Sequence, residues 1–312
     1  MKKISHWKLI ALFGALVVVF AAVRIFRSPM LEGNLPLRLT EIDSSKVTEF
    51  IIIPAKGMNE EVRVVRSEGW KLKRGSETLR AEQGIATNTM RMLMGLRPDR
   101  VVSKKKSKWN DFQVGDSTGT HVKLMAGNTV MTNLWIGRSG FTQTPGQQYG
   151  GKSFTYVRLD GEEEVFAVEG FLDAQFNRRF DDWRDKSFMR LQRDSVDKVS
   201  FRYPADSSFI LEKRMGNWMI GNQPADGAAV TAYLGGLEYK NMGSFAGQAP
   251  AGNAEIVVTL GNGNKQVGLI EAWSGMGSWI VRSAHQPDIF FSMEDGAMKD
   301  ITCGKKKFLP KP

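Results

Sequence analysis

An ordered series of features occurs twice along this chain, and an internal repeat of this size predicts two similar structural units. Each copy has alternating apolar and polar residues that end at a tryptophan, then a helical stripe, then further strand-like segments. The landmarks are Gly69-Trp70, Val157-Arg158 and Val165-Phe166 in the first copy, and Gly216-Asn217-Trp218, Val281-Arg282 and Ile289-Phe290 in the second. Because the order is the same in both copies, we interpret the pattern as a duplication.

The helices of the two units are predicted by apolar residues at positions i, i+3, i+4 and i+7. The stripes are Thr89, Met92, Leu93 and Leu96 in the first copy, and Val230, Tyr233, Leu234 and Leu237 in the second. Asp226 is placed to cap the second helix. A third stripe joins the units through Leu172, Phe176, Phe180 and Trp183, with Asp173 as its expected cap.

These patterns predict an α+β fold made of two similar repeated modules. Each module has mainly antiparallel strands and one or two short helices, and the modules span residues 46–193 and 194–312. Hydrophobic residues make up 42% of the chain and charged residues 24%, which excludes a disordered chain and a polytopic membrane protein.

The first 30 residues differ from the rest. Three lysines precede the uninterrupted apolar run Leu9–Val23, and Arg24 and Arg27 follow it. A membrane-spanning helix needs about 20 residues, which the run reaches if apolar neighbours are counted and flanking cations extend to the headgroups. We predict a cytoplasmic basic segment at 1–8, a transmembrane signal anchor at 9–27 and a linker at 28–45 that is rich in turn-forming residues.

A cleaved signal peptide is the open alternative, because it has the same basic start and apolar middle. A small-x-small cleavage site is missing just beyond the run, which favours the anchor. Both interpretations export the chain from about residue 30 onward. The net charge of +10 predicts attraction to anionic neighbours.

The exported part resembles a bacterial family known only as domain of unknown function 4340. The resemblance is carried by Trp109-Asn110-Asp111-Phe112-Gln113-Val114, Leu134-Trp135-Ile136-Gly137, Tyr156-Val157-Arg158-Leu159-Asp160-Gly161 with Val165-Phe166-Ala167-Val168, and Asp182-Trp183-Arg184-Asp185-Lys186. One departure is Gln113, where many members carry Gly. The resemblance implies a bacterial cell-envelope protein, often encoded near gliding-motility-type ABC transport genes. Together with the anchor, it predicts a single-pass inner-membrane protein whose bulk is periplasmic. It implies no activity and no functional residues.

One segment matches a phosphate-binding loop in its letters. Gly146–Ser153 has the pattern of two glycines followed by Lys-Ser, but a phosphate loop must open a helix, whose N–H groups then face the phosphates. The residues that follow, Phe154–Leu159, alternate as a strand does. We therefore expect neither nucleotide nor cofactor binding.

Other candidate chemistry is sparse. His121 and His285 lack a partner at helical spacing, and Cys303 is the single cysteine, so we predict no metal site. The acidic groups Glu162-Glu163-Glu164 and Asp181-Asp182 with Asp185 are interpreted as solvated charges rather than an acid–base pair. We predict no catalytic residues and no enzyme activity.

Two lysine runs, Lys104-Lys105-Lys106 with Lys108 and Lys305-Lys306-Lys307, favour an anionic lipid or acidic partner, or serve solubility alone. Nucleic acid is not expected for an exported protein. Trp70 and Trp218 recur at matching positions, which predicts core packing.

Three hypotheses for the function remain open. The first is a membrane-anchored, non-catalytic accessory protein that presents its modules to a protein partner, with ABC transporter components as the expected class. The second is an envelope ligand-binding protein that uses a cleft between the modules for a glycan or small molecule, with Trp273 and Trp279 exposed in a groove. The third is a hydrolase that relies on paired carboxylates or a Ser–His pair.

Overall fold

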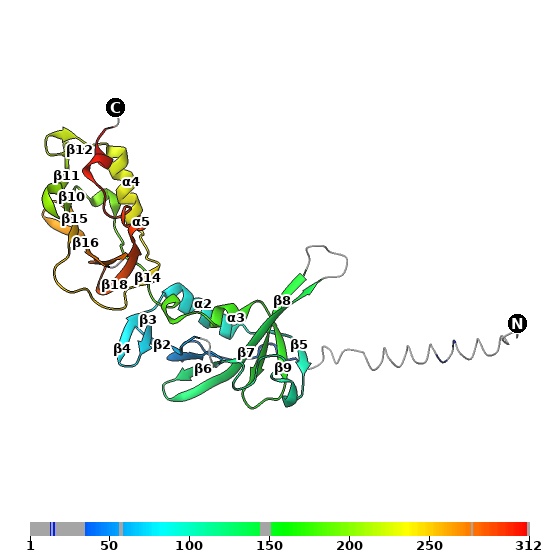
Figure 1. Ribbon diagram of the computed structural model, residues 1–312. Helices are drawn as coiled ribbons and strands as arrows, with labels where there is room; N and C mark the ends of the chain where they lie inside the picture. Colours follow the sequence, from blue (N-terminus) through cyan, green and yellow to red (C-terminus); the bar gives the residue numbers. More distant parts are fainter. Residues whose placement is uncertain are drawn as a thin grey trace. The chain divides into compact units, whose positions relative to one another are not determined.

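The computed structural model describes residues 13, 15, 35–55, 59–143, 151–275 and 277–310 (Figure 1). The chain divides into two compact units, Met1–Trp183 and Arg184–Pro312. Each unit contains one nine-stranded sheet, and all strand pairs within the described residues are antiparallel.

The first sheet has the strand order β4-β3-β2-β1-β6-β7-β8-β9-β5. Its strands are β1 (Glu49–Ile53), β2 (Val62–Ser67), β3 (Gly69–Arg74), β4 (Glu77–Arg80), β5 (Pro98–Ser103), β6 (Thr120–Ala126), β7 (Thr129–Gln143), β8 (Gly151–Leu159) and β9 (Val165–Glu169). The helical elements of this unit are α2 (Gln83–Met94), η1 (Lys106–Lys108), α3 (Leu172–Phe176) and η2 (Phe180–Asp182).

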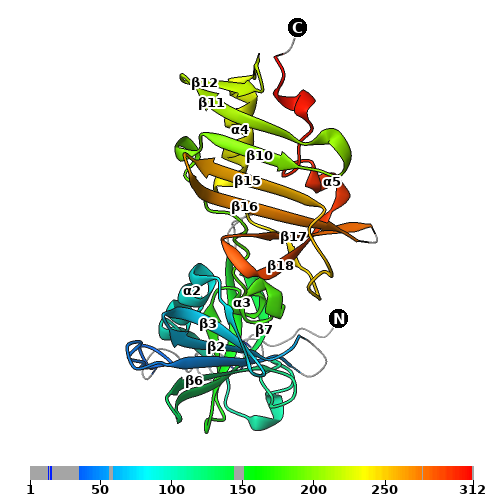
Figure 2. The same cartoon turned by 90° about the vertical axis from the view of Figure 1, so that its left-hand side faces the viewer.

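The second sheet has the order β13-β12-β11-β10-β15-β16-β17-β18-β14 (Figure 2). Its strands are β10 (Lys198–Arg202), β11 (Phe209–Arg214), β12 (Asn217–Ile220), β13 (Gln223–Pro224), β14 (Ser244–Phe245), β15 (Ile256–Asn262), β16 (Lys265–Ser274), β17 (Ser278–Ser283) and β18 (Gln286–Glu294). The helical elements of this unit are η3 (Arg193–Ser195), η4 (Ala205–Ser207), α4 (Gly227–Glu238), α5 (Asp295–Met298) and η5 (Lys305–Phe308).

The two strand orders are the same once the second is numbered from its own first strand. In both sheets the first four strands form a meander, the helix follows the fourth strand, and the strand after the helix crosses to the far edge. Two similar modules of antiparallel strands with few short helices are therefore confirmed. We call the two units module 1 and module 2.

Each core lies between the helices and one face of the sheet. In module 2 the predicted stripe is buried at all four positions, and Asp226 accepts hydrogen bonds from the N–H groups of Ala228 and Ala229, as expected for a cap. In module 1 the buried face of α2 is Ala86, Thr89, Met90 and Leu93. Leu96 is also buried but lies beyond the helix end, because Gly95 terminates α2.

The start of module 1 includes residues that sequence assigned to the linker at 28–45. Leu39 is buried, and its N–H donates to the carbonyl oxygen of Leu96 at 2.8 Å. The Thr40 hydroxyl donates to the carbonyl oxygen of Leu93. From Leu39 onward this segment is therefore attached to the C-terminal end of α2 and belongs to the module.

The region between the modules differs from its predicted helix. The four apolar residues of the third stripe are buried, but α3 ends at Phe176 and only the 3-10 turn η2 follows. Asp173 does not cap α3; it accepts a hydrogen bond from Ser139 on β7 instead. The units divide after Trp183 rather than after residue 193, because Phe188, Met189 and Leu191 pack into the core of module 2.

The predicted anchor at 9–27 lies outside the described residues, apart from Phe13 and Ala15. No helix among the described residues is long and apolar enough to cross a membrane.

Candidate functional site

The outer face of the first sheet, opposite α2, carries the most elaborate side-chain arrangement of module 1. His121, Trp135 and Arg158 are direct cross-strand neighbours on β6, β7 and β8. The imidazole of His121 stacks on the Trp135 ring, with centroids 4.4 Å apart and planes 5° apart. The guanidinium carbon of Arg158 lies 3.9 Å from the Trp135 centroid and 3.7 Å from that of Trp109. We call these four residues the aromatic–arginine stack.

Hydrogen bonds hold the charged member of the stack in place. Arg158 is 2% exposed, its Nε donates to the carbonyl oxygen of Val114 at 2.9 Å, and its Nη2 donates to Asp116 at 2.8 Å. Burial lowers the pKa of Arg158, and the charge of Asp116 opposes that shift. The guanidinium is thus a fixed, nearly water-free cation rather than a group free to bind a ligand.

His121 is similarly engaged. Its Nε2 contacts Asn133 Oδ1, and Asn133 Nδ2 donates to Asp160 at 2.9 Å. Burial lowers the pKa of His121, which the hydrogen bond to Asn133 only partly opposes. The neutral ring is therefore favoured, and it packs as a flat partner for Trp135.

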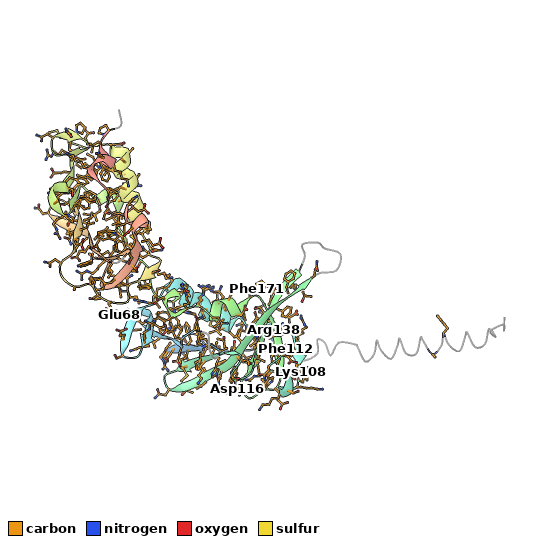
Figure 3. All side chains as sticks on the ribbon, viewed as in Figure 1. Glu68, Lys108, Phe112, Asp116, Arg138 and Phe171 are labelled. Carbon is orange, nitrogen blue, oxygen red and sulfur yellow. The ribbon has the colours of Figure 1, made fainter. Side chains whose placement is uncertain are left out.

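The segment around Phe112 and Gln113 crosses this face, and its position explains the glycine at Gly137. The N–H of Arg138 donates to the carbonyl oxygen of Phe112, so the segment lies directly on β7 next to Gly137 (Figure 3). A Cβ atom at Gly137 would collide with the carbonyl oxygen of Phe112. Gln113 has a φ of 57°, in the left-handed region where Gly is favoured. Glycine would adopt that conformation without strain.

Module 2 has a different arrangement at the corresponding position. Arg282 on β17 pairs across the ladder with Glu271 on β16, and its Nε lies 2.9 Å from Glu271 Oε2. The Trp273 indole N–H donates to the carbonyl oxygen of Gly252 in the segment before β15. A carboxylate thus takes the cross-strand position that Trp135 holds in module 1.

The described end of the phosphate-loop-like segment is a strand. Residues 144–150 lie outside the described part of the chain, but Gly151–Leu159 forms β8 rather than a helix. Lys152 and Ser153 pair with Thr142 and Phe141 in the antiparallel ladder. Since no helix starts here, no helix N-terminus faces a phosphate at Lys152-Ser153.

His285 lies in the turn between β17 and β18 and contacts a serine that the sequence did not single out. Its Nε2 is 3.2 Å from the hydroxyl of Ser187, which also lies 3.1 Å from Gln286 Nε2. Gln286 donates to the backbone carbonyl of Ser187 as well, at 2.6 Å. Ser187 is only 4% exposed, and its hydroxyl contacts side chains of its own module. These bonds attach the start of module 2 to its sheet.

The acidic groups are also engaged locally. Glu164 pairs with Lys104 at 2.8 Å, and Asp182 pairs with Arg179 at 3.4 Å. The described residues contain no group of three His, Cys, Asp or Glu side chains that could hold a metal ion. Cys303 is buried, and burial raises the pKa of its thiol even though Lys307 Nζ lies 3.1 Å from the sulfur.

A hollow of about 630 Å³ lies in the β1–β3 region of module 1 and is lined mainly by charged side chains. Its charges compensate one another, because Arg74 pairs with Glu60 at 2.7 Å and Arg63 lies 3.1 Å from Glu49. The hollow therefore has no excess charge that would select a ligand.

The tryptophans of the two modules do not form an open platform within the described residues. Trp70, Trp218 and Trp273 are buried, and Trp279 packs against the core of module 2. Trp109 is half-buried, with Lys106 and Arg158 over its ring. Their indoles are committed to packing, as predicted for Trp70 and Trp218.

A family model described as a domain of unknown function (DUF4340) matches residues 70–252. This match covers more than half of the 312-residue chain. The chain belongs to this family. No curated protein and no solved structure matches it.

The DUF4340 match begins at Trp70 in β3, continues through the aromatic–arginine stack, and ends before β15. It therefore spans the larger part of module 1 and the first strands and helix of module 2. The stack was missed from sequence because its members are far apart along the chain. The available signal was the alternation that places Trp135 and Arg158 on one face of adjacent strands.

Proposed function

We propose that this DUF4340 chain is a single-pass protein of the bacterial inner membrane whose two modules lie in the periplasm. The observation that carries this proposal is the apolar run Leu9–Val23, with basic residues on both flanks, ahead of two folded modules. Residues 1–8 would remain in the cytoplasm, and the helix at 9–27 would stay attached as a signal anchor.

We further propose that the modules act as a non-catalytic accessory that binds a protein partner. Support comes from the way candidate reactive groups are used: Arg158 is stacked, Ser187 is buried, and the Cys303 thiol is held protonated. The resemblance that places related chains near ABC transport genes makes a transporter component the expected partner.

The test is in-cell photocross-linking of the full chain, with photoreactive residues on exposed positions of each module, followed by identification of the captured proteins. The matched control carries an unrelated transmembrane helix in place of residues 9–27. We expect both chains to capture the same integral membrane transport component, because the modules determine the partner. Capture of no membrane protein above background would contradict the accessory role.

Topology is tested separately. A protease added to the outside of spheroplasts should digest a tag placed after Pro312 and spare a tag placed before Met1. The opposite pattern, or release of the chain as a soluble periplasmic protein, would refute the anchor.

A further inference from the structure

Module 1 has an extension that module 2 lacks. Strand β7 has 15 residues where its counterpart β16 has 10, and β8 has 9 residues where β17 has 6. The added residues form an arm, Ser139–Gln143 with Gly151–Phe154, that projects beyond the rest of the sheet (Figure 1). A duplicated fold does not need this arm, because module 2 forms the same sheet without it.

The arm presents an apolar side chain to solvent. Phe141 is 61% exposed, and its ring lies over Gly151 on the opposite strand, where any Cβ would collide with it. Phe171 is 55% exposed at the root of the arm (Figure 3). Phe141 and Phe171 are close along the fold. Gly170, next to Phe171, donates its N–H to the carbonyl oxygen of Ser153, and Ser153 is the ladder partner of Phe141.

The chain enters module 1 at the same end. Leu37 is 82% exposed, two residues before Leu39 is pinned to Leu96 by a backbone hydrogen bond. Strand β5 begins two residues after Leu96, and its residues Asp99 and Arg100 line a hollow of about 230 Å³ together with Glu169 of β9 and Thr142 and Lys152 of the arm. Entry point and arm therefore share one end of the module.

Three cations at this end have no carboxylate within ion-pair distance among the residues that the structure describes. The exposed Arg38 and Arg97 flank the Leu39–Leu96 hydrogen bond, and Lys152 lies on the arm. Arg100 pairs with Asp99 at 2.6 Å, but no carboxylate of the described residues pairs with Arg38, Arg97 or Lys152. Four cations, Arg38, Arg97, Arg100 and Lys152, thus face two carboxylates, Asp99 and Glu169, so this end combines exposed apolar side chains with an excess of positive charge.

The proposed anchor determines what this end can meet. Residues 28–34 are the only chain between Arg27 and Leu35, and they span at most about 25 Å when fully extended. This end of the module is therefore confined to the neighbourhood of the lipid headgroups.

We propose that this end of module 1 is a docking surface for an anionic bilayer. The surface consists of Leu37, Arg38, Arg97, Phe141, Lys152 and Phe171. Its cations bind lipid phosphates, and its apolar side chains enter the interface between headgroups and acyl chains. The inference rests on the proposed anchor and adds that the module lies against the membrane rather than extending away from it.

The experiment uses the full chain in phosphatidylcholine vesicles with and without phosphatidylglycerol. A dye is attached at Gln143→Cys on the arm or, as matched control, at Glu77→Cys on β4 at the opposite sheet edge. The native Cys303 is 4% exposed and stays unlabelled. Quenching by nitroxide-headgroup lipid reports proximity to the bilayer, while vesicle flotation reports the anchor independently.

We expect strong quenching at Gln143→Cys in anionic vesicles and weak quenching at Glu77→Cys. Arg38→Gln, Arg97→Gln and Lys152→Gln should each lower the ratio of docked to undocked modules by about fivefold, while Lys73→Gln on β3 should not. Phe141→Ser with Phe171→Ser should also weaken quenching. Unchanged thermal unfolding of these surface variants shows that they remain folded.

Flotation with equal or absent quenching at the two label positions would overturn docking and leave the anchor intact. Loss of flotation would refute the anchor and docking together. Equal quenching with and without phosphatidylglycerol, and no change in the three charge variants, would overturn the recognition of anionic lipid. Absence of quenching combined with cross-linking of position 141 to a protein in cells would assign this end to a protein partner instead.

Discussion

Replacing Arg158 with lysine separates planar stacking from charge. Lysine keeps the positive charge but loses the flat guanidinium that lies between Trp109 and Trp135 at 3.7 and 3.9 Å. Each desolvated cation–ring contact contributes on the order of 1 kcal/mol. The hydrogen bond from Nε to Val114 adds about 1.5 kcal/mol, because its donor is charged. We predict that Arg158→Lys lowers the unfolding free energy of module 1 by about 2–4 kcal/mol.

The matched control is Arg282→Lys in module 2. Here the main partner is the Glu271 carboxylate, and the ring centroids of Trp273 and Phe290 are farther away, at 5.5 and 5.3 Å. Lysine can also pair with a carboxylate, and the pair is partly exposed. Arg282→Lys should therefore lower the unfolding free energy of module 2 by about 1 kcal/mol or less.

The assay is native-state hydrogen exchange of the full chain in detergent, which reports β8 and β17 separately and so assigns each loss to its module. Burial removes water from the guanidinium, and this desolvation opposes the stabilisation from stacking. Equal losses for Arg158→Lys and Arg282→Lys, or a gain for Arg158→Met, would show that desolvation dominates and that the stack does not stabilise the fold.

Four further outcomes are expected, for the buried tryptophans, Lys152, Gln113 and His121. Trp70→Ala and Trp218→Ala should each destabilise only their own module, by about 3–5 kcal/mol in hydrogen exchange, because both indoles are buried. Lys152→Ala should leave both stabilities unchanged, and neither chain should bind ATP saturably in calorimetry. Gln113→Gly should stabilise module 1 by about 1 kcal/mol in urea unfolding, since the φ of 57° strains any side chain. Burial holds the pKa of His121 below its usual 6.5, so the unfolded chain takes up the proton first. The unfolding free energy of module 1 should therefore be highest above about pH 6.5 and fall as the pH drops below it. In His121→Phe the midpoint of urea unfolding should lose this pH dependence.

The repeat and the second helix could be predicted because their signals are local. In α4 the positions at helical spacing are the buried ones. Asp226 caps the helix by accepting hydrogen bonds from the backbone N–H groups two and three residues later. Strand alternation likewise located β2 and β3, where buried and more exposed residues alternate, whereas β1 buries the consecutive residues Phe50, Ile51 and Ile52.

The errors came from contacts between distant segments. Residue Leu39 was assigned to the linker because its neighbours are turn residues, yet it bonds to Leu96 across the module. The stripe from Leu172 to Trp183 is apolar at helical spacing, but Asp173 is drawn to Ser139 and the helix stops at Phe176. Tertiary partners outweighed local propensity at these places.

Comparison of the modules indicates where to look for function. Both copies preserve the strand order, the helix position and an arginine at the same place after the apolar stretch of β8 or β17. They differ in how that arginine is held, because Arg158 lies between two rings and pairs with Asp116, whereas the main partner of Arg282 is Glu271. Since each arrangement neutralises a buried or half-buried cation within the module, this difference requires no ligand. The arm formed by Ser139–Gln143 and Gly151–Phe154 is another kind of difference, because it adds the exposed apolar side chain of Phe141. Exposed apolar surface promotes aggregation of a protein that has no partner, and in stable proteins it marks a site of interaction. The arm is therefore the first place to look for a partner or bilayer contact.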